Sequence, residues 1–429
     1  MMDRMPVELP SDAINLADFV RRGDTVIWSQ GPSEPLSLTE PLVRQRAEIG
    51  RFRAFLGSSY SRTFEPGQAD VIEFFGLGAV GRTRKILEAG ALDVLPCHLS
   101  QFAALMRDGE LKIDVVLLQL RENQSGAYSY GSVCSYLPDA VRNARVVIAE
   151  VNDQAPYTIS SQKPDPARIN FVVRVSRPLL DVPSRAWTNE DLTIAKHVAP
   201  LIENGAVLQI GIGTLPDAIL SELRNHRDLG IHSGVIGDGV IELINSGVVT
   251  NASKAIDSGI SVTGSLFGTK ALVDFAHNNT SIRVDPVSYT HDIRVLAKFK
   301  RFATINSAIE VDLLGQINSE VANRKYIGTI GGQTDFVRGT QISERGRSIV
   351  ALSARASASG PSRIVSKLSS GIVTGARADA DFVVTEFGIA ELKGRTVKER
   401  ARRLIAVAHP DDRDDLARSW KDEMLSILG

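Results

Sequence analysis

The segment Leu229–Gly239, LGIHSGVIGDG, gathers groups that could do chemistry around a sharp backbone turn. His232 and Ser233 follow an apolar lead-in, Gly234 comes next, and Asp238 lies between two glycines. Imidazole, hydroxyl and carboxylate groups are the common proton donors and acceptors of enzymes. The loop therefore has the composition of an active site, although it carries little that could act as a strong nucleophile.

Two other carboxylates lie at positions where a fold could hold them next to a substrate. Glu34 lies in the short glycine loop GPSEP, and Glu310 lies at the end of an apolar run in EVDLLGQINSE. A carboxylate that a fold holds near a substrate can take a proton from water, so both residues are candidate general bases. The alternative for each is an ordinary solvated or ion-paired side chain.

Two glycine loops lie where a strand is expected to lead into a helix. GIGTLPDAI contains Gly211 and Gly213, and IGTIGGQTDFVRGT contains Gly331, Gly332 and Gln333. Glycines let the main chain approach a ligand, and the free amides at a helix start favour phosphate or a developing oxyanion. The first loop does not have the spacing of a dinucleotide-binding motif. A structural turn is the alternative for the first loop and a plain surface loop for the second.

Short apolar runs alternate with helical patterns along the whole chain. TVIWS, ADVIEFF, DVVLLQL, ARVVIAEV and AVLQIGI are typical of buried strands, whereas GRTRKILEAG, LPDAILSELRNH and TVKERARRLIAVA are typical of helices. This alternation predicts an α/β fold with parallel or mixed sheets covered by helices.

A weak internal repeat relates the segment that starts at Ala17 to the one that starts at Ala199. Each reads as a helix, a glycine, a strand, a glycine loop with a proline and a second helix. The repeat predicts two related α/β domains, residues 1–187 and 188–429. The proline-rich stretch 157–187 is the expected linker.

Composition narrows the classes of function. The chain has 429 residues, a formal net charge of −1 and 43% hydrophobic residues, so nothing in it indicates nucleic acid or an anionic membrane as a partner. Its two cysteines, Cys97 and Cys134, predict buried free thiols and no disulfide framework or metal site. The sequence also has no apolar run of about 18 residues and no signal-peptide pattern, which predicts a cytoplasmic protein.

Taken together, the motifs resemble those of the acetyl-CoA hydrolase/CoA-transferase family, which includes 4-hydroxybutyrate and butyryl-CoA:acetate CoA-transferases. The resemblance rests on six ordered stretches of the second half: QIGIGTLPDAIL, LGIHSGVIGDGVIELINSGVVTN, GSLFGTKALVDF, INSAIEVDLLGQINSE, GTIGGQTDFVRG and VVTEFGIAELKGRTVKERARRLIAVAHP. It continues more thinly through GPSEP, GRTRKILEAG, DVVLLQL and IAEVND, so it covers nearly the whole chain.

The resemblance implies a CoA-transferase-like fold of two α/β domains with the active site in the cleft between them, commonly in a homo-oligomer. Acyl-CoA and carboxylic acids are the implied substrates, with coenzyme A as a substrate and no further cofactor or metal. In this family a glutamate attacks the thioester and carries CoA as a glutamyl thioester. The residues that match the family's CoA-binding or oxyanion-binding loops are Gly211, Gly213, Gly268, Thr269, Lys270, Gly331, Gly332 and Gln333.

This chain departs from the family at the nucleophile. The resemblance places Gly234 where the family has its glutamate, and a glycine cannot carry CoA. The first expectation is therefore hydrolysis of an acyl-CoA, at the thioester or at the bond β to its carbonyl, by water. Glu34, Asp238 or Glu310 would activate the water, and His232 would orient the acyl oxygen. The alternatives are CoA transfer through another acid, such as Glu34, and a non-catalytic CoA-ester binder or partner subunit.

Overall fold

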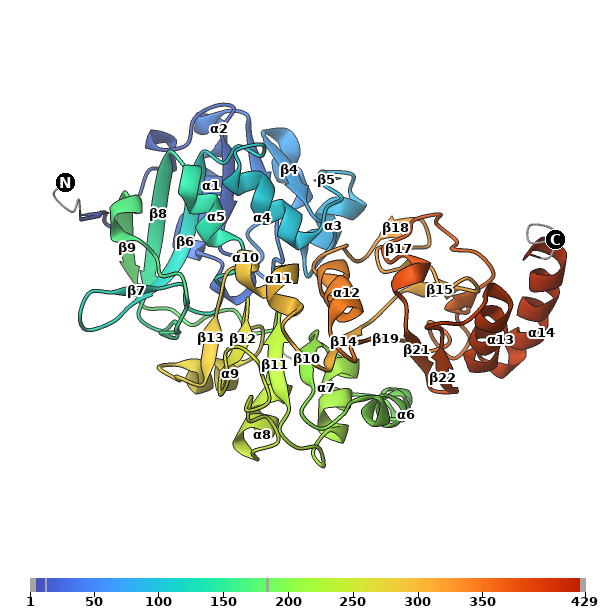
Figure 1. Cartoon of the computed structure of the whole chain (residues 1–429). Coiled ribbons are helices and arrows are strands. Elements are labelled where there is room, and N and C mark those ends of the chain that lie inside the picture. The colour runs from blue at the N-terminus through green and yellow to red at the C-terminus, as the bar shows by residue number, and fades with distance from the viewer. Residues whose placement is uncertain (1–4, 12–13, 183–184, 425–429) are drawn as a thin grey trace. The chain divides into compact units, whose positions relative to one another are not determined.

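The computed structural model describes residues 5–11, 14–182 and 185–424, which group into two units (Figure 1). The first unit lies within Met1–Pro183 and also includes Gly234–Asp238 and Ile260–Asp292. The second unit lies within Ser184–Ser233, Gly239–Gly259 and Ile293–Gly429. The units interleave along the chain, and the two domains divided at residue 187 stay a prediction.

A nine-stranded sheet forms the centre of the first unit, with the strand order β1-β9-β8-β6-β2-β3-β4-β5 and β7 paired to β6. Every printed pairing along this path is parallel, and only the β6–β7 pairing is antiparallel. The central strands are buried on both faces, which explains their continuous apolar runs. Its strands are β1 (Val7–Glu8), β2 (Thr25–Trp28), β3 (Phe52–Phe55), β4 (Ile72–Gly76), β5 (Leu92–Val94), β6 (Val115–Glu122), β7 (Tyr128–Ser129), β8 (Val146–Asn152) and β9 (Phe171–Val175).

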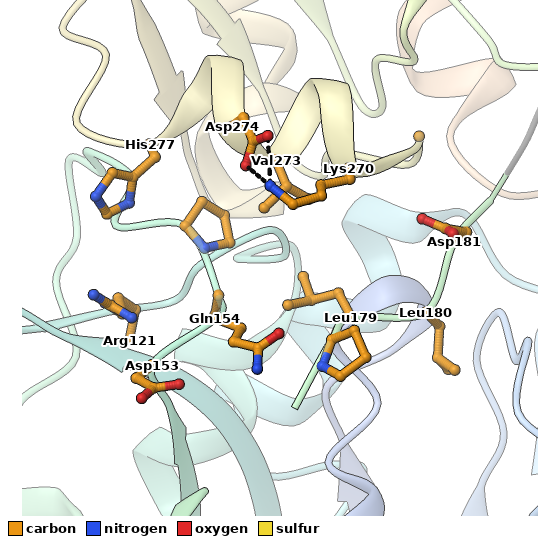
Figure 2. Close-up of a pocket in the computed structure, with 14 residues that line it drawn as sticks. Arg121, Asp153, Gln154, Leu179, Leu180, Asp181, Lys270, Val273, Asp274 and His277 are labelled. Carbon is orange, nitrogen blue, oxygen red and sulfur yellow. Dashed lines mark hydrogen bonds and ion pairs between the residues drawn. The ribbon is translucent and has the colours of Figure 1, made fainter. Parts of the chain in front are cut away.

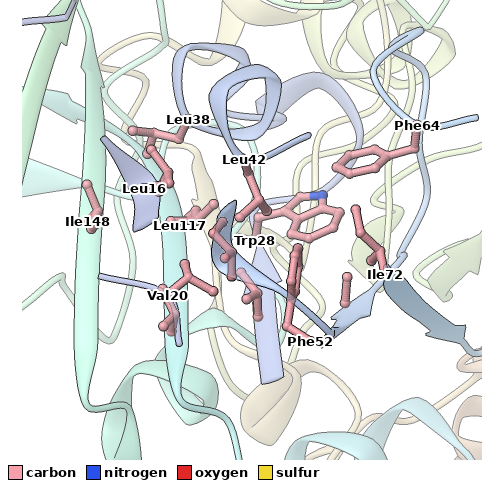
Figure 3. Packing of buried hydrophobic residues seen from close by; sticks show 14 of the residues in the cluster. Leu16, Val20, Trp28, Leu38, Leu42, Phe52, Phe64, Ile72, Leu117 and Ile148 are labelled. Atoms are coloured by element: carbon pink, nitrogen blue, oxygen red, sulfur yellow. The ribbon is translucent and has the colours of Figure 1, made fainter. Parts of the chain in front are cut away.

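Helices of the first unit cover both faces of this sheet. On one face, Leu42 of α1 packs into the cluster around Trp28, whose ring stacks on Phe64 at 4.7 Å between centroids (Figure 3). On the other face, Phe55 stacks on Phe102 of α4 at 4.5 Å. The helices are α1 (Leu36–Arg44), α2 (Arg46–Ile49), α3 (Thr83–Glu88), α4 (Leu99–Arg107) and α5 (Leu137–Asn143).

Two later segments complete the first unit. Residues 260–292 contribute the parallel pair β12 (Ser261–Thr263) and β13 (Ile282–Val284), together with α9 (Lys270–Ala276) and α10 (Val287–Thr290). The short loop 234–238 belongs to the same unit. The loop GPSEP at residues 31–35 and the loop at Gly234 are therefore parts of one body.

The second unit has its own parallel strands in the order β11-β10-β14-β19-β21, and β22 pairs antiparallel with β21. These strands are β10 (Val207–Ile210), β11 (Gly230–Ser233), β14 (Phe302–Asn306), β19 (Arg347–Ala351), β21 (Phe382–Thr385) and β22 (Gly388–Glu391). Smaller pairings involve β15 (Glu310–Asp312), β16 (Ile317–Asn318), β17 (Val321–Ala322), β18 (Lys325–Tyr326) and β20 (Ile364–Val365). The helices are α6 (Asn189–Val198), α7 (Thr214–Glu222), α8 (Gly239–Asn245), α11 (Ile293–Leu296), α12 (Gln333–Ile342), α13 (Val397–Val407) and α14 (Pro410–Ser419).

The α/β class, with parallel and mixed sheets, is confirmed. The expected linker is wrong over part of its length, because Phe171–Val175 form β9 and pair with β8. Prolines on either side of FVVRV suggested a connection, but the apolar residues of this run are those of a strand. Cys97 and Cys134 are buried free thiols, as expected.

Candidate functional site

The loop after β2 is fixed by close contacts of Gly31. Gly31 has a φ of +61°, and a Cβ atom there would lie 2.4 Å from Cζ of Phe267. Its amide donates to the carbonyl of Ser58 at 2.7 Å. A glycine is therefore required here both by the backbone conformation and by the ring that lies against it.

The loop ends at Glu34, which is fully buried. Its carboxylate accepts hydrogen bonds from the amide of Tyr60 at 2.6 Å, the amide of Ser61 at 3.2 Å and the hydroxyl of Ser59 at 3.2 Å. Burial raises the pKa of Glu34, and the hydrogen bonds from Ser61, Tyr60 and Ser59 oppose this shift. The side chain is thus a rigid acceptor that holds residues 59–61 in place.

A buried ion pair fixes the other side of Glu34. Arg177 donates to the carbonyl oxygen of Glu34 and, through Nε, to Oε1 of Glu150 at 3.0 Å. Oε2 of Glu150 accepts from the amide of Ser37 at 2.9 Å, at the start of α1. The sequence reasoning missed Arg177, because the residue lies in the stretch interpreted as a linker.

The loop 234–238 is bonded to the segment after β12. The amide of Ile236 donates to Ser265 at 3.0 Å, and the amide of Phe267 donates to Ile236 at 2.9 Å. A Cβ atom on Gly264 would lie 2.8 Å from the carbonyl oxygen of Gly234, so this approach is tight. Phe267 therefore links the loop at Gly234 to Gly31.

Asp238 has a structural role in this arrangement. Its Oδ1 and Oδ2 accept from the amide of Thr269 at 3.2 and 3.1 Å, directly before α9. A Cβ on Gly268 would lie 2.6 Å from Oδ1 of Asp238, which explains the glycine of the FGTK turn. The hydroxyl of Thr269 accepts from the amide of Ala271 as the N-cap of α9.

Gly268 and Lys270 line a pocket of about 410 Å³ within the first unit (Figure 2). Lys270 is exposed, and its Nζ bonds both oxygens of Asp274 at 2.6 Å. The pocket also contains Arg121, which the sequence reasoning missed. Its other lining residues are Asp153, Gln154, Ala155, Pro156, Pro178, Leu179, Leu180, Asp181, Val273 and His277.

A second, more open pocket of about 580 Å³ in the first unit includes Tyr60 and Ser61, the residues that Glu34 holds. Leu180 lines both pockets, and its amide donates to Pro32 at 3.4 Å. The two pockets therefore share Leu180 in their linings. No sequence signal marked Tyr60, because a lone tyrosine in a loop is common.

The remaining predicted residues lie in the second unit. His232 is fully buried, and its ring centroid lies 4.7 Å from that of Phe299. Gly213, with a φ of +119°, precedes α7, and a Cβ on it or on Gly211 would meet open space. Gly211 and Gly213 therefore leave the start of α7 accessible.

The glycine loop before α12 is held by a side chain. Gly331 has a φ of +54° and Gly332 precedes the helix. Oε1 of Gln333 accepts from the hydroxyl of Ser319 at 2.9 Å.

Glu310, the third candidate carboxylate, is also buried, and both of its oxygens accept hydrogen bonds. Its donors are Ser369 and the side chain of Asn318.

The described residues were also searched for metal-binding groups and for helices that could cross a membrane. Within residues 5–11, 14–182 and 185–424, no three His, Cys, Asp or Glu side chains form a group that could hold a metal ion. No helix in the described ranges combines the length and apolar character that crossing a membrane requires.

Comparison with known proteins agrees with these features. Residues 10–161 match the acetyl-CoA hydrolase/transferase N-terminal domain, and residues 268–420 match the C-terminal domain of the same family. A 4-hydroxybutyrate coenzyme A transferase of Clostridium kluyveri is 37% identical over 403 residues, which cover 92% of this chain and 93% of the relative.

The chain is also similar to solved structures over nearly its whole length. RipA from Yersinia pestis is 30% identical, with a TM-score of 0.90 and 96% of each chain covered. A 4-hydroxybutyrate CoA-transferase from Porphyromonas gingivalis is 31% identical, with a TM-score of 0.82 and 97% of each chain covered. The relatives include proteins named CoA-transferases and proteins named acetyl-CoA hydrolases. The chain is therefore an enzyme of the acetyl-CoA hydrolase/transferase family.

Proposed function

We propose that this enzyme hydrolyses an acyl-CoA by direct attack of water on the thioester carbonyl. The resemblance that places Gly234 at the family's nucleophile position supports the proposal, because glycine has no group that could form a covalent intermediate. The substrates are acyl-CoA esters and the products a carboxylate and coenzyme A. Neither a further cofactor nor a metal is required, since water activation and carbonyl polarisation need only acid, base and hydrogen-bond donors.

This proposal rests on one observation, the hydrogen bonds that hold the three candidate carboxylates. Glu34 is held by three residues, Asp238 by the amide before α9, and Glu310 by Ser369 and Asn318. A carboxylate that attacks a thioester must present an oxygen lone pair to the carbonyl carbon. Because local amides or hydroxyls hold all three in position, we infer that none moves to bonding distance of the thioester carbon as a replacement nucleophile.

In the reaction, the water oxygen forms a bond to the thioester carbon while a base takes the water proton. The tetrahedral oxyanion then collapses, the carbon–sulfur bond breaks, and coenzyme A leaves as a thiolate that is protonated by the conjugate acid or by solvent. Glu34 is the candidate base, because a base needs only a hydrogen bond to the water and no bond to the thioester carbon, and because burial raises the pKa of Glu34 and so makes it a stronger base.

The glycine loops would supply the other requirements. We assign CoA-ester or oxyanion binding to Gly211, Gly213, Gly331 and Gly332, whose loops precede α7 and α12. His232 would orient the acyl oxygen. In the first unit, we assign CoA-ester or oxyanion binding to Gly268 and Lys270.

Mass spectrometry combined with thiol release tests the proposal. The enzyme is incubated with a panel of acyl-CoA esters, free thiol is measured, and the intact protein is weighed after borohydride treatment. Hydrolysis predicts thiol release without an adduct and without movement of labelled CoA to a second carboxylic acid. A borohydride-reduced adduct on any glutamate, or exchange between two acids, would establish transfer instead. Binding of CoA esters with no thiol release over the panel would leave a non-catalytic binder.

The Glu34→Gln variant tests the assigned base. Glutamine keeps an oxygen that accepts from Tyr60 and Ser61, but it cannot take a proton. We expect thiol release to fall about 10²- to 10⁴-fold with CoA-ester affinity kept. Wild-type turnover in this variant would eliminate Glu34 as the base. The Asp70→Asn variant, which changes an exposed carboxylate of the same unit, is the control.

A further inference from the structure

Three arginines of the second unit gather around one carboxylate, that of Glu203, which lies in the turn before β10. Arg301 directly precedes β14, Arg345 lies in the turn before β19, and Arg347 is the first residue of β19. Nε of Arg301 lies 3.2 Å from Oε2 of Glu203. Nη2 of Arg345 lies 2.8 Å from the same oxygen, and Nη2 of Arg347 lies 2.9 Å from Oε1. Because β10, β14 and β19 are parallel neighbours, the turns before them bring the four side chains together.

This arginine cluster, Arg301, Arg345 and Arg347, carries more positive charge than Glu203 can neutralise. Three guanidiniums surround one carboxylate, so two positive charges are left over. Lys300 and Glu344, in the same turns, pair with each other at 2.9 Å and leave this balance unchanged. Within residues 5–11, 14–182 and 185–424, the side chains of Arg301 and Arg345 form no ion pair or hydrogen bond except those to Glu203.

The arginines are more exposed to solvent than the carboxylate that they share. The side chains of Arg301 and Arg345 are 40% and 57% exposed, whereas that of Glu203 is 21% exposed. Arg347 is less exposed, and its Nη1 also donates to the carbonyl of Leu201 at 2.6 Å, which anchors it. A guanidinium has several N–H donors besides the one that Glu203 accepts. An anion that arrives from solvent can therefore bind the arginines without displacing Glu203.

The backbone at two of these positions is unfavourable for arginine. Arg301 has a φ of +52° and Arg345 a φ of +61°, in the left-handed region that glycine or asparagine adopts at lower cost. Both side chains nevertheless reach the same carboxylate, although one arginine is enough to neutralise it. Pairing with Glu203 therefore does not account for both arginines.

The arginine cluster and the loop GIGT lie at opposite ends of β10. Glu203 precedes this strand, which comprises Val207–Ile210, and Gly211 and Gly213 follow it. The parallel neighbours β14 and β19 begin at the same end as β10. The cluster therefore lies at the amino ends of these strands, and the glycines that we assign to CoA-ester or oxyanion binding lie at the carboxyl end of β10.

We propose that Arg301, Arg345 and Arg347 bind the phosphate group of a small anion, at a site separate from that of the acyl-CoA. Guanidinium groups match phosphate oxygens with paired N–H donors. A phosphate monoester carries close to two negative charges at pH 7, which balances the two charges that Glu203 leaves over, whereas a monocarboxylate brings only one. The inference goes beyond the proposed hydrolysis and does not depend on it, because binding is measured without turnover.

Calorimetric titration of the full chain in a phosphate-free buffer of low ionic strength tests the ligand class. The probes are inorganic phosphate, glycerol 3-phosphate and acetate. We expect each phosphate compound to bind at least about tenfold more tightly than acetate, with an affinity that falls as salt is added. Absence of binding by both phosphate compounds at millimolar concentration would overturn the proposal, as would acetate binding as tightly as they do.

Variants of the cluster should change phosphate affinity in opposite directions. Arg301→Gln and Arg345→Gln should each weaken glycerol 3-phosphate binding about 10- to 100-fold. Glu203→Gln keeps an oxygen that accepts from the arginines but removes the competing negative charge, so it should strengthen binding about 3- to 10-fold. Arg402→Gln, at an exposed arginine of α13, is the matched control and should leave binding unchanged. Unfolding midpoints without ligand establish that each variant is folded.

The same series separates a phosphate site from an ion-pair network that serves stability alone. A purely structural network predicts lower unfolding midpoints in Arg301→Gln, Arg345→Gln and Glu203→Gln, with glycerol 3-phosphate binding unchanged in all three. That result would place the anion elsewhere and overturn the site. Weaker binding in Glu203→Gln, in a variant that is folded, would also contradict the charge balance on which the proposal rests.

Competition distinguishes the two sources of a phosphate group, because coenzyme A carries phosphates of its own. Glycerol 3-phosphate affinity that is unaffected by saturating coenzyme A supports a separate site. Displacement by coenzyme A but not by dephospho-coenzyme A, which lacks the 3′-phosphate, would place that phosphate on the arginines. Displacement by both would make the cluster part of the CoA site in another way, and either result would overturn the separate site.

Discussion

The ring of Phe267 occupies the position that a side chain on Gly31 would need: a Cβ there would lie 2.4 Å from Cζ of the phenylalanine. The two residues are more than two hundred positions apart in the sequence. Phe267 is also bonded through its amide to Ile236, two residues after Gly234. This contact therefore links the loop GPSEP at residues 31–35 to the loop from which the family's nucleophile is expected to be missing.

Replacing Gly31 by alanine should destabilise the first unit. The new Cβ collides with Phe267 and must adopt a φ of +61°, so we expect the free energy of unfolding to fall by about 2–4 kcal/mol. Urea denaturation measures the change. Gly67→Ala, at a glycine with open space around it, should have a much smaller effect. Equal losses of unfolding free energy in the two variants would mean that the Phe267 ring moves aside without an energetic penalty.

Glu34 should make stability depend on pH in a defined direction. Its pKa is raised in the folded chain by burial, whereas in the unfolded chain it has the ordinary value of 4.5. Between these two pKa values the folded state binds more protons, so the contribution of Glu34 is fully present below pH 4.5 and is lost as pH rises through the folded pKa. We expect the stability of wild type relative to Glu34→Gln to fall across this window, measured by urea denaturation at a series of pH values. A difference that rises with pH would contradict the shift.

Installing a glutamate at Gly234 tests whether the missing nucleophile decides the reaction. If Gly234 stands at the family's nucleophile position, Gly234→Glu should gain a borohydride-reducible adduct with an acyl-CoA and exchange of CoA between two carboxylic acids. Wild type measured in parallel should show neither. A folded variant that still only hydrolyses its substrate would show that more than this residue separates hydrolysis from transfer.

Asp238 should behave in mutagenesis as a structural residue that fixes the turn before α9. Removing its carboxylate in Asp238→Ala leaves the amide of Thr269 without an acceptor, which should cost about 1–3 kcal/mol of stability. Asp238→Asn keeps an oxygen and should cost less. Thiol release, compared at a temperature where all three proteins are folded, should change little. A loss of turnover without a loss of stability would indicate that Asp238 has a catalytic role.

The ion pair between Arg177 and Glu150 should be essential to the loop at Glu34. Glu150 is fully buried and Arg177 is 18% exposed, so Glu150→Ala leaves a largely enclosed arginine without its partner. We expect a loss of about 3–5 kcal/mol in urea denaturation. Breaking the exposed pair of Arg46 and Asp70 by Asp70→Asn should be far less damaging. Comparable losses would imply that water replaces Glu150 at low cost.

Much of the architecture was predictable because it follows from local patterns. The apolar runs at TVIWS, DVVLLQL and ARVVIAEV correspond to β2, β6 and β8, and GRTRKILEAG and TVKERARRLIAVA contain α3 and α13. Buried parallel strands need continuous apolar residues, so these runs carry a strong signal. The strand Phe171–Val175 was missed because flanking prolines resemble a connection, and only its pairing with β8 identifies it.

The sequence alone determined the α/β class, the motifs that indicate the family, and the candidate groups Glu34, Asp238 and Gly234, because residue type and order are sufficient for these. Which groups remain available for chemistry was decided only by the tertiary structure. Asp238 is engaged by the amide of Thr269, and Glu34 by residues about 26 positions away. The partners of a carboxylate come from segments that the fold brings together, and the spacing along the chain does not specify them.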